Sequence, residues 1–234
     1  SSDVCSSVYL HISVPNTREI TQFLTQHSLD FLLIFLLLGS FDLTKLINGI
    51  LQLYKTREGW LSPFPWCEEF QFFLGKIFTR LKVVRRKKTR GKITDVFVDM
   101  SSILDPHEEC SAPRTVLIEG EPGIGKTTYC KKYVYDWATK KQGCGSTAFK
   151  AVLLLKCRDI HFDVWGAIDD QLLPRDIDEE VKQQFFQFIR ENQSSILLIL
   201  DGLDELPSSK FSMFSELIEG KVLQIGRASC RERV

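Results

Sequence analysis

GEPGIGKT, residues 120–127, follows the apolar run RTVLIE of residues 114–119 and leads into a segment with a helical pattern. The stretch matches the pattern G-x-x-x-x-G-K-[ST] in full. Its glycines allow the main chain to wrap around phosphate groups, so that successive N–H groups point inward. The sequence therefore predicts a phosphate-binding loop (P-loop) between a strand and a helix, and with it a nucleoside triphosphate and Mg²⁺.

Each residue type in this loop has a physical role. Gly123 and Gly125 allow the close approach of phosphate, and the positive end of the following helix adds to the attraction. We expect Lys126 to reach the β- and γ-phosphates as a point charge, and the Thr127 hydroxyl to bind Mg²⁺. Pro122 stiffens the loop and lowers the entropy cost of ordering it. The predicted nucleotide-binding residues are Gly120, Glu121, Pro122, Gly123, Ile124, Gly125, Lys126, Thr127 and Thr128.

A second acidic motif follows the apolar run SILLIL, residues 195–200. The run ends in Asp201, which is the Walker B form, and we predict that this carboxylate binds Mg²⁺ directly or through water. Asp204 and Glu205 come just past the strand end. We predict that Glu205, with Asp204 as the second choice, orients or deprotonates the attacking water. The alternative is that these two acids cap a helix or lie on the surface.

The fold class follows from apolar runs that alternate with helical patterns. Strands are expected at 114–119, 149–155 and 195–200, and helices at 126–141, 163–173 and 178–192. Near-continuous apolar strands indicate a sheet that is covered on both faces. We therefore predict an α/β fold, an incomplete P-loop NTPase sandwich of three layers with a mostly parallel sheet.

An α-helical region is predicted before this domain. Asp42 is expected to cap a helix that carries its apolar residues between 43 and 54, and the segment 59–66 breaks that helix. A second helix is expected to follow, with one continuous apolar face. Core packing explains this face better than a cofactor site does. Its residues are Phe70, Phe73, Leu74, Ile77, Phe78 and Leu81.

Two further segments could indicate a nucleic-acid or a membrane partner, but neither pattern favours one. The basic run from Lys82 to Lys92 has no aromatic residue on which a nucleic-acid base stacks, so a solvated linker or loop is favoured over a nucleic-acid patch. The apolar run FLLIFLLL, residues 31–38, is shorter than the roughly 20 residues of a membrane-spanning helix. A buried core helix is favoured there, with a membrane segment as the alternative.

The composition is ordinary for a globular protein, with 44% apolar and 26% charged residues and a formal net charge of zero. This charge balance gives no reason to expect a nucleic-acid partner. The seven cysteines are scattered without a C-x-x-C pair, which favours reduced thiols in the cytoplasm over disulfides or zinc ligands.

The motifs GEPGIGKTT (120–128) and ILLILDGLDEL (196–206) resemble the NACHT domain of NOD-like receptors, which are STAND-class NTPases. The Asp-Gly-Leu-Asp-Glu ending is the specific part. LKCRDI (155–160) resembles the strand that follows the P-loop helix in this family, and residues 60–84 resemble the region upstream of NACHT in some invertebrate members.

The resemblance implies a cytoplasmic switch in innate immune or cell-death signalling. Such a protein is closed with ADP, opens and oligomerises with ATP, and contacts a downstream signalling adaptor. By position, Lys126, Thr127 and Asp201 are then the nucleotide and Mg²⁺ residues. We expect a weak ATPase at most, because the sensor arginine of the family should lie further along the chain. A constitutive P-loop ATPase, a nucleotide kinase and a nucleotide-binding scaffold are the alternatives.

These observations divide the chain into four parts. Residues 1–58 are a helical region of uncertain role, 59–112 a helical pre-NACHT segment with the basic linker, and 113–224 the N-terminal part of a NACHT domain. Residues 225–234, IGRASCRERV, back-translate into a string that matches a common sequencing-library adapter. We expect these ten residues to be an artefact, the alternative being a native basic tail.

Overall fold

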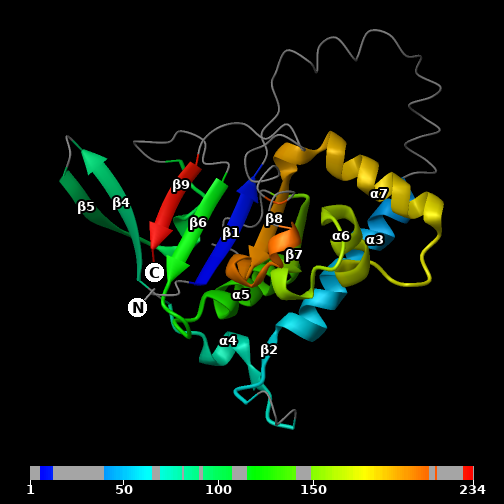
Figure 1. The fold of residues 1–234 in the computed structure, drawn as a ribbon. Helices are drawn as coiled ribbons and strands as arrows, with labels where there is room; N and C mark the ends of the chain where they lie inside the picture. Colours follow the sequence, from blue (N-terminus) through cyan, green and yellow to red (C-terminus); the bar gives the residue numbers. More distant parts are fainter. Residues whose placement is uncertain are drawn as a thin grey trace.

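The computed structural model describes residues 6–12, 40–64, 69–80, 82–89, 92–106, 115–140, 149–210, 214 and 229–233. These residues form a mixed α/β structure around one large sheet (Figure 1). The strands are β1 (Ser6–Ile12), β2 (Trp60–Leu61), β3 (Phe72–Phe73), β4 (Val83–Thr89), β5 (Lys92–Val98), β6 (Thr115–Gly120), β7 (Ala151–Lys156), β8 (Ile196–Asp201) and β9 (Ser229–Arg233). The α-helices are α3 (Ser40–Leu53), α4 (Leu74–Ile77), α5 (Lys126–Ala138), α6 (Val164–Leu172) and α7 (Glu179–Glu191).

The three strands expected in the nucleotide domain are confirmed as β6, β7 and β8. β7 and β8 are parallel neighbours, and β6 runs in the same direction because both β6 and β8 pair antiparallel with β1. The helices expected at 126–141, 163–173 and 178–192 are confirmed as α5, α6 and α7, with slightly different ends. Among the described residues, the alternation of strand and helix therefore matches the prediction.

The sheet as a whole is mixed rather than mostly parallel. Its order is β5-β4-β9-β6-β1-β8-β7, in which only the pairs β9–β6 and β8–β7 are parallel. The antiparallel β1 lies within residues 1–58, which were expected to be helical, and its segment shows no clear hydrophobic period from which a strand could be predicted. β9 lies within residues 225–234; its pairing does not bear on the origin of those residues, and the adapter origin remains a prediction.

The basic run forms a hairpin and not the linker or loop that was expected. Strands β4 and β5 pair from Val83↔Val98 to Thr89↔Lys92, with β5 at one end of the sheet order. β4 pairs with β9 only at Val84 and Arg85, so most of it lies in a two-stranded ribbon with β5 at the end of the sheet, where charged residues are tolerated. The run of lysine and arginine therefore forms a strand, although its composition is typical of a linker or loop.

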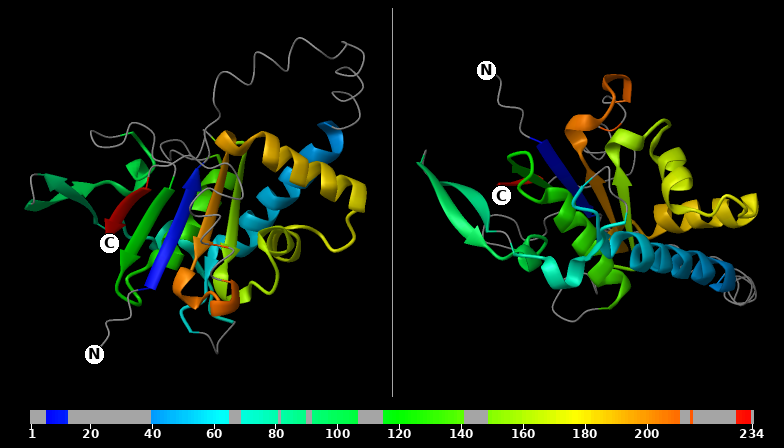
Figure 2. Two further views of the ribbon diagram at one scale, coloured as in Figure 1. Left: turned by 45° about the horizontal axis from the view of Figure 1, so that its top comes forward. Right: turned by 90° about the horizontal axis from the view of Figure 1, so that it is seen from below.

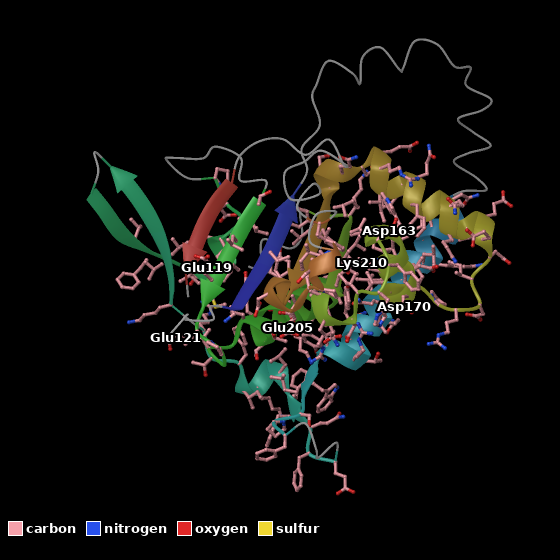
Figure 3. All side chains as sticks on the ribbon, in the orientation of Figure 1. Glu119, Glu121, Asp163, Asp170, Glu205 and Lys210 are labelled. Carbon is pink, nitrogen blue, oxygen red and sulfur yellow. The ribbon has the colours of Figure 1, made fainter. Side chains whose placement is uncertain are left out.

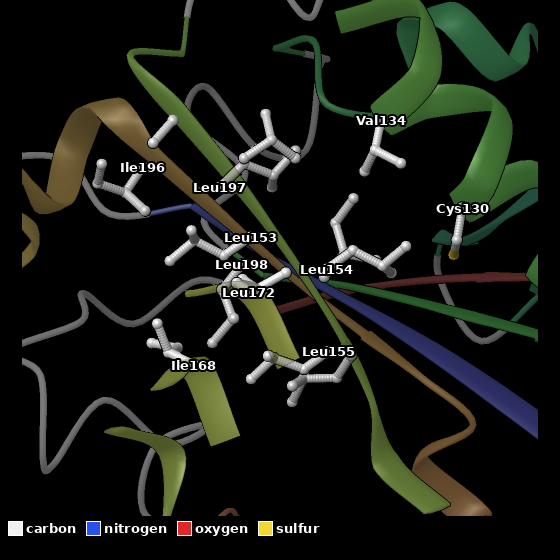
Figure 4. Packing of buried hydrophobic residues seen from close by; sticks show 14 of the residues in the cluster. Cys130, Val134, Leu153, Leu154, Leu155, Ile168, Leu172, Ile196, Leu197 and Leu198 are labelled. Carbon is white, nitrogen blue, oxygen red and sulfur yellow. The ribbon is translucent and has the colours of Figure 1, made fainter. Parts of the chain in front are cut away.

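Helices cover both faces of the strands that lead to the site. Cys130 and Val134 of α5 lie on one side of β7 and β8, and Ile168 and Leu172 of α6 lie on the other (Figure 4). Figure 2 shows the same arrangement from below, with α3 and α5 on one side of the sheet and α6 on the other. β7 and β8 are therefore fixed from both faces, as continuous apolar strands require.

The first upstream helix is confirmed, but its start is not. α3 begins at Ser40, so Asp42 lies inside the helix and not at its N-cap. The helix continues as a π-helical turn, η2 (Tyr54–Glu58), and ends before Gly59 as expected. The run 31–38 lies outside the described residues, so its assignment as a core helix stays a prediction. Within the described ranges, no helix is both long and apolar enough to span a membrane.

The prediction of a second upstream helix over residues 70–81 is wrong for most of that length. Phe72 and Phe73 form β3, which pairs with β2, and only Leu74–Ile77 are α-helical. Phe70 is 61% exposed and Ile77 is also exposed, whereas Leu74 is fully buried. The aromatic residues form a small extended pair instead, with the Phe73 ring packed against Trp60 and Tyr135. Leu81 lies outside the described residues.

Tyr54 attaches the upstream helix to the sheet. Its buried hydroxyl donates a hydrogen bond to Val152 O (3.0 Å) and accepts one from Leu154 N (2.9 Å) on β7. On the same strand, the side chain of Gln171 exchanges hydrogen bonds with the main chain of Lys156. β7 is the last strand in the sheet order, so these side chains satisfy main-chain groups that have no neighbouring strand.

We expect Tyr54→Phe to lower the free energy of unfolding by about 1–3 kcal/mol, since it leaves two buried main-chain groups without their partner. Urea denaturation measures this loss. Tyr135→Phe is the control, because that hydroxyl makes no hydrogen bond to a described residue while its ring packs against Phe73. Equal stability of Tyr54→Phe and the native chain would contradict the assigned role of the hydroxyl.

Candidate nucleotide-binding site

The predicted P-loop connects β6 to α5. β6 ends at Gly120, α5 begins at Lys126, and the loop between them is mostly exposed. Gly123 (φ 78°) and Gly125 (φ 104°) are in the left-handed region, which residues with a side chain rarely adopt. The loop is thus shaped by its glycines, and the first N–H groups of α5, which lack partners within the helix, face the same end of the sheet.

Lys126 is held inside the loop by main-chain oxygens. Its ammonium group donates to Gly120 O (2.7 Å) and to Glu121 O (2.8 Å), and the residue is only 7% exposed. An ammonium group has three donors, so a phosphate can either use the remaining one or replace a carbonyl oxygen. The positive charge is therefore already positioned where the sequence predicted a phosphate.

Thr127 and Asp201 meet across the sheet edge. The Thr127 hydroxyl donates to Asp201 Oδ1 at 3.0 Å, which joins residues 74 positions apart. Asp201 is the last residue of β8 and is 9% exposed. Mg²⁺ prefers oxygen ligands and usually keeps several waters, so one hydroxyl and one carboxylate beside a phosphate loop fit this ion. The described residues contain no cluster of three or more His, Cys, Asp or Glu suited to another metal.

The pKa of Asp201 is raised above its ordinary value. Burial is the largest cause, and the carboxylate of Glu205 acts in the same direction. The hydrogen bond from Thr127 and the charges of Lys156 and Lys131 lower the pKa but do not reverse the shift. A divalent cation at this carboxylate would favour the ionised form and offset the cost of burial.

A tight turn after β8 positions the second acidic pair. Gly202 is left-handed (φ 75°) and is followed by the short helix η7, Leu203–Glu205, in which Glu205 N donates to Gly202 O. Asp204 and Glu205 are exposed, and Figure 3 shows Glu205 and Glu121 at the end of the sheet where β6 and β8 finish. The turn therefore brings both predicted catalytic acids to the same edge as the P-loop, and their role in catalysis stays a prediction.

We expect Gly202→Ala to lower the free energy of unfolding by about 1–2 kcal/mol, because a side chain is disfavoured in the left-handed region. The added Cβ would also lie 3.3 Å from the carboxyl carbon of Glu205. Gly49→Ala in α3 is the control of opposite sign. It has open space and should gain up to about 1 kcal/mol from helix propensity. Urea denaturation of both variants distinguishes the two effects.

The structure adds charged residues that the sequence did not single out. Glu58, at the end of η2, is fully buried beside Lys131 of α5 and Lys156 of β7. In the sequence, Glu58 looks like an ordinary polar residue at a helix end, and no local pattern indicates its burial.

Two buried thiols also lie near the acids. Burial is the main reason that the pKa of Cys157 is raised to about 12 and that of Cys130 is raised well above its usual range.

The part of the chain that contains these motifs is similar to a known protein family. The family model described as NACHT domain matches residues 114–225, which include both the P-loop and the acidic turn after β8. These residues form a NACHT domain. The resemblance inferred from the P-loop and the Asp-Gly-Leu-Asp-Glu ending is thereby confirmed.

Curated relatives of this NACHT domain are members of the NLR family. The chain is 35% identical over 104 residues to NLR family CARD domain-containing protein 4 of Xenopus tropicalis, covering 44% of the chain and 10% of that protein. It is 30% identical over 122 residues to Protein NLRC5 of Homo sapiens, covering 47% and 6%. It is 27% identical over 154 residues to NACHT, LRR and PYD domains-containing protein 3 of Bos taurus, covering 57% and 14%. The chain thus spans a small part of the length of these relatives.

Proposed function

We propose that this NACHT domain is the nucleotide-binding part of an ATP/ADP-dependent switch of the NOD-like receptor type. The contact between Thr127 Oγ1 and Asp201 Oδ1 carries the proposal, because it brings the two expected Mg²⁺ ligands together from separate elements. The enclosed ammonium of Lys126 supports it. Helices on both faces of β7 and β8 support the inference of a three-layer P-loop NTPase sandwich.

In this proposal the loop binds the phosphates and the strand end binds the metal. Lys126 and the main-chain N–H groups of the loop, which Pro122 lacks, hold the β- and γ-phosphates, while Thr127 and Asp201 hold Mg²⁺. The ion supplies positive charge that neutralises the phosphate oxygens. Glu205, or Asp204, orients the water that attacks the γ-phosphate.

The switch requires that ATP and ADP stabilise different states. Moving a two-state equilibrium from 1:99 to 99:1 takes about 5.5 kcal/mol of differential binding free energy. Contacts to the γ-phosphate must supply much of this difference. We further infer ATP-dependent self-association, contact with a signalling adaptor and a cytoplasmic location, in innate immune or cell-death signalling. The likeness to NLR family relatives supports these inferences.

Residues 113–224 would form the nucleotide-binding part of this switch, and residues 59–112 a pre-NACHT segment. The test is a comparison of single-turnover and steady-state ATP hydrolysis by the purified chain, together with the rate of ADP release. We expect hydrolysis to be slow and ADP to be retained. Sustained turnover of many ATP molecules per second without a partner would contradict the switch and indicate an ordinary ATPase.

A further inference from the structure

A buried carboxylate lies outside the part of the chain that matches the family. Glu58 has no solvent exposure, and three cations surround it. Its Oε1 is 2.6 Å from Arg57 Nε and 3.8 Å from Lys156 Nζ, and its Oε2 is 3.5 Å from Lys131 Nζ. Burial alone would raise the pKa of Glu58, but the charges of Lys156, Arg57 and Lys131 lower it overall. The group is therefore an anion in the interior.

The upstream helix fixes where this anion lies. Tyr54, one turn before Glu58, is bonded through its hydroxyl to the middle of β7. Glu58 is consequently placed toward the carboxyl end of the same strand, where Lys156 is its last residue. Contacts between η2 and α5 add Lys131 from the helix that follows the P-loop. The carboxylate thus joins the upstream helix to two elements of the nucleotide site.

The two lysines beside Glu58 also influence the predicted metal ligand, Asp201. Lys156 is the Cα partner of Asp201 in the parallel pairing of β7 with β8. Lys156 and Lys131 both act electrostatically on Asp201. Two cations are therefore shared between a carboxylate of the upstream helix and the carboxylate that is expected to bind Mg²⁺.

We propose that Glu58 is a positioning residue of the metal site: it balances the charge of Lys131 and Lys156, so that Asp201 remains available to a divalent cation. The inference rests on the proposed nucleotide-binding function. If Glu58 has this role, the packing of α3 and η2 against β7 also affects how tightly Mg²⁺ binds. A displacement of the upstream helix would remove the balancing charge from the site.

The sign of the effect follows from Coulomb's law. Without the charge of Glu58, the positive charge of the two ammonium groups is no longer balanced, and it opposes the binding of a divalent cation at Asp201. The same excess of positive charge attracts the phosphates of a nucleotide. Loss of Glu58 should thus weaken metal binding while it leaves metal-free nucleotide binding unchanged or makes it tighter. A merely structural role would weaken both together.

The experiment compares Glu58→Gln with the native chain, using a fluorescent ATP analogue titrated with Mg²⁺ and again in the presence of EDTA. We expect the Mg²⁺ concentration for half-maximal effect to rise about five- to tenfold, and the affinity in EDTA not to fall. Tyr54→Phe is the matched control. It removes one hydroxyl from the same helix but leaves Glu58 and every other charge in place in the folded chain, so its Mg²⁺ requirement should not change.

A second variant tests the proposal with the opposite sign. Lys156→Met keeps Glu58 and removes one of the shared cations, so it should lower the Mg²⁺ requirement, even if Glu58→Gln does not fold. The double variant Glu58→Gln/Lys156→Met should return toward the native requirement. An unchanged requirement in folded Glu58→Gln, a parallel loss of both affinities, or a raised requirement in Lys156→Met would overturn the inference. Failure of the native chain to bind nucleotide would instead refute the proposed function.

Discussion

Lys126→Ala is expected to weaken ATP binding by about 100- to 20,000-fold. Hydrogen bonds between charged groups contribute about 1.5–3 kcal/mol each, and a lysine that reaches two phosphates would lose two of them. At 1.4 kcal/mol for each tenfold change in affinity, this loss gives the stated range. Titration with a fluorescent ATP analogue in the presence of Mg²⁺ measures it directly.

The matched control for this variant is Lys150→Ala. Lys150 is exposed and its ammonium bonds to Asn192, far along the chain from the P-loop. Its removal changes the net charge by the same amount but should leave the affinity unchanged. Circular dichroism during heating shows whether each variant is folded. If folded Lys126→Ala bound ATP within about threefold of the native chain, this lysine would not be the phosphate ligand.

Asp201→Asn should remove most of the contribution of Mg²⁺ to nucleotide binding, an expected loss of about 10- to 100-fold when the metal is present. In EDTA, the variant and the native chain should bind ATP almost equally. Asp159→Asn is the control, since Asp159 is an exposed acid just after the end of β7. A variant whose nucleotide affinity still depended on Mg²⁺ as the native chain does would contradict the assignment of Asp201.

Asp201→Asn should also change the stability of the ligand-free chain. The pKa of Asp201 is raised in the folded chain, mainly by burial. Its contribution to stability is therefore fully present below the unfolded-state pKa and is lost as the pH rises through the folded-state pKa. At neutral pH the ionised carboxylate destabilises the ligand-free fold. Asp201→Asn should accordingly melt at the same or a higher temperature than the native chain, with a smaller change between pH 4 and 7.

The sequence could predict the elements whose stability depends on near-continuous apolar strands. β7 and β8 are such strands, and the P-loop motif located the start of α5 at Lys126. The meeting of Thr127 with Asp201 also followed, because the carboxyl ends of parallel strands lie at one edge of a sheet. These features are local in sequence or are imposed by topology.

The remaining features depend on long-range pairing. β1 pairs with strands more than a hundred residues away, and its own segment shows no period. The helical spacing from Phe70 to Leu81 does not give one continuous buried face, since Phe72 and Phe73 pair with Leu61 and Trp60 instead. The burial of Glu58 arises from Lys131 and Lys156, which come from two separate elements. No local pattern encodes contacts of these kinds.

Residues 120–128 and Asp201 are proposed to bind one Mg²⁺–nucleotide together. The most direct test is isothermal titration of the purified native chain with a non-hydrolysable ATP analogue, with Mg²⁺ and with EDTA. We expect one nucleotide per chain, with binding that is tighter when Mg²⁺ is present. No binding at millimolar nucleotide, or binding of equal strength with and without Mg²⁺, would contradict it.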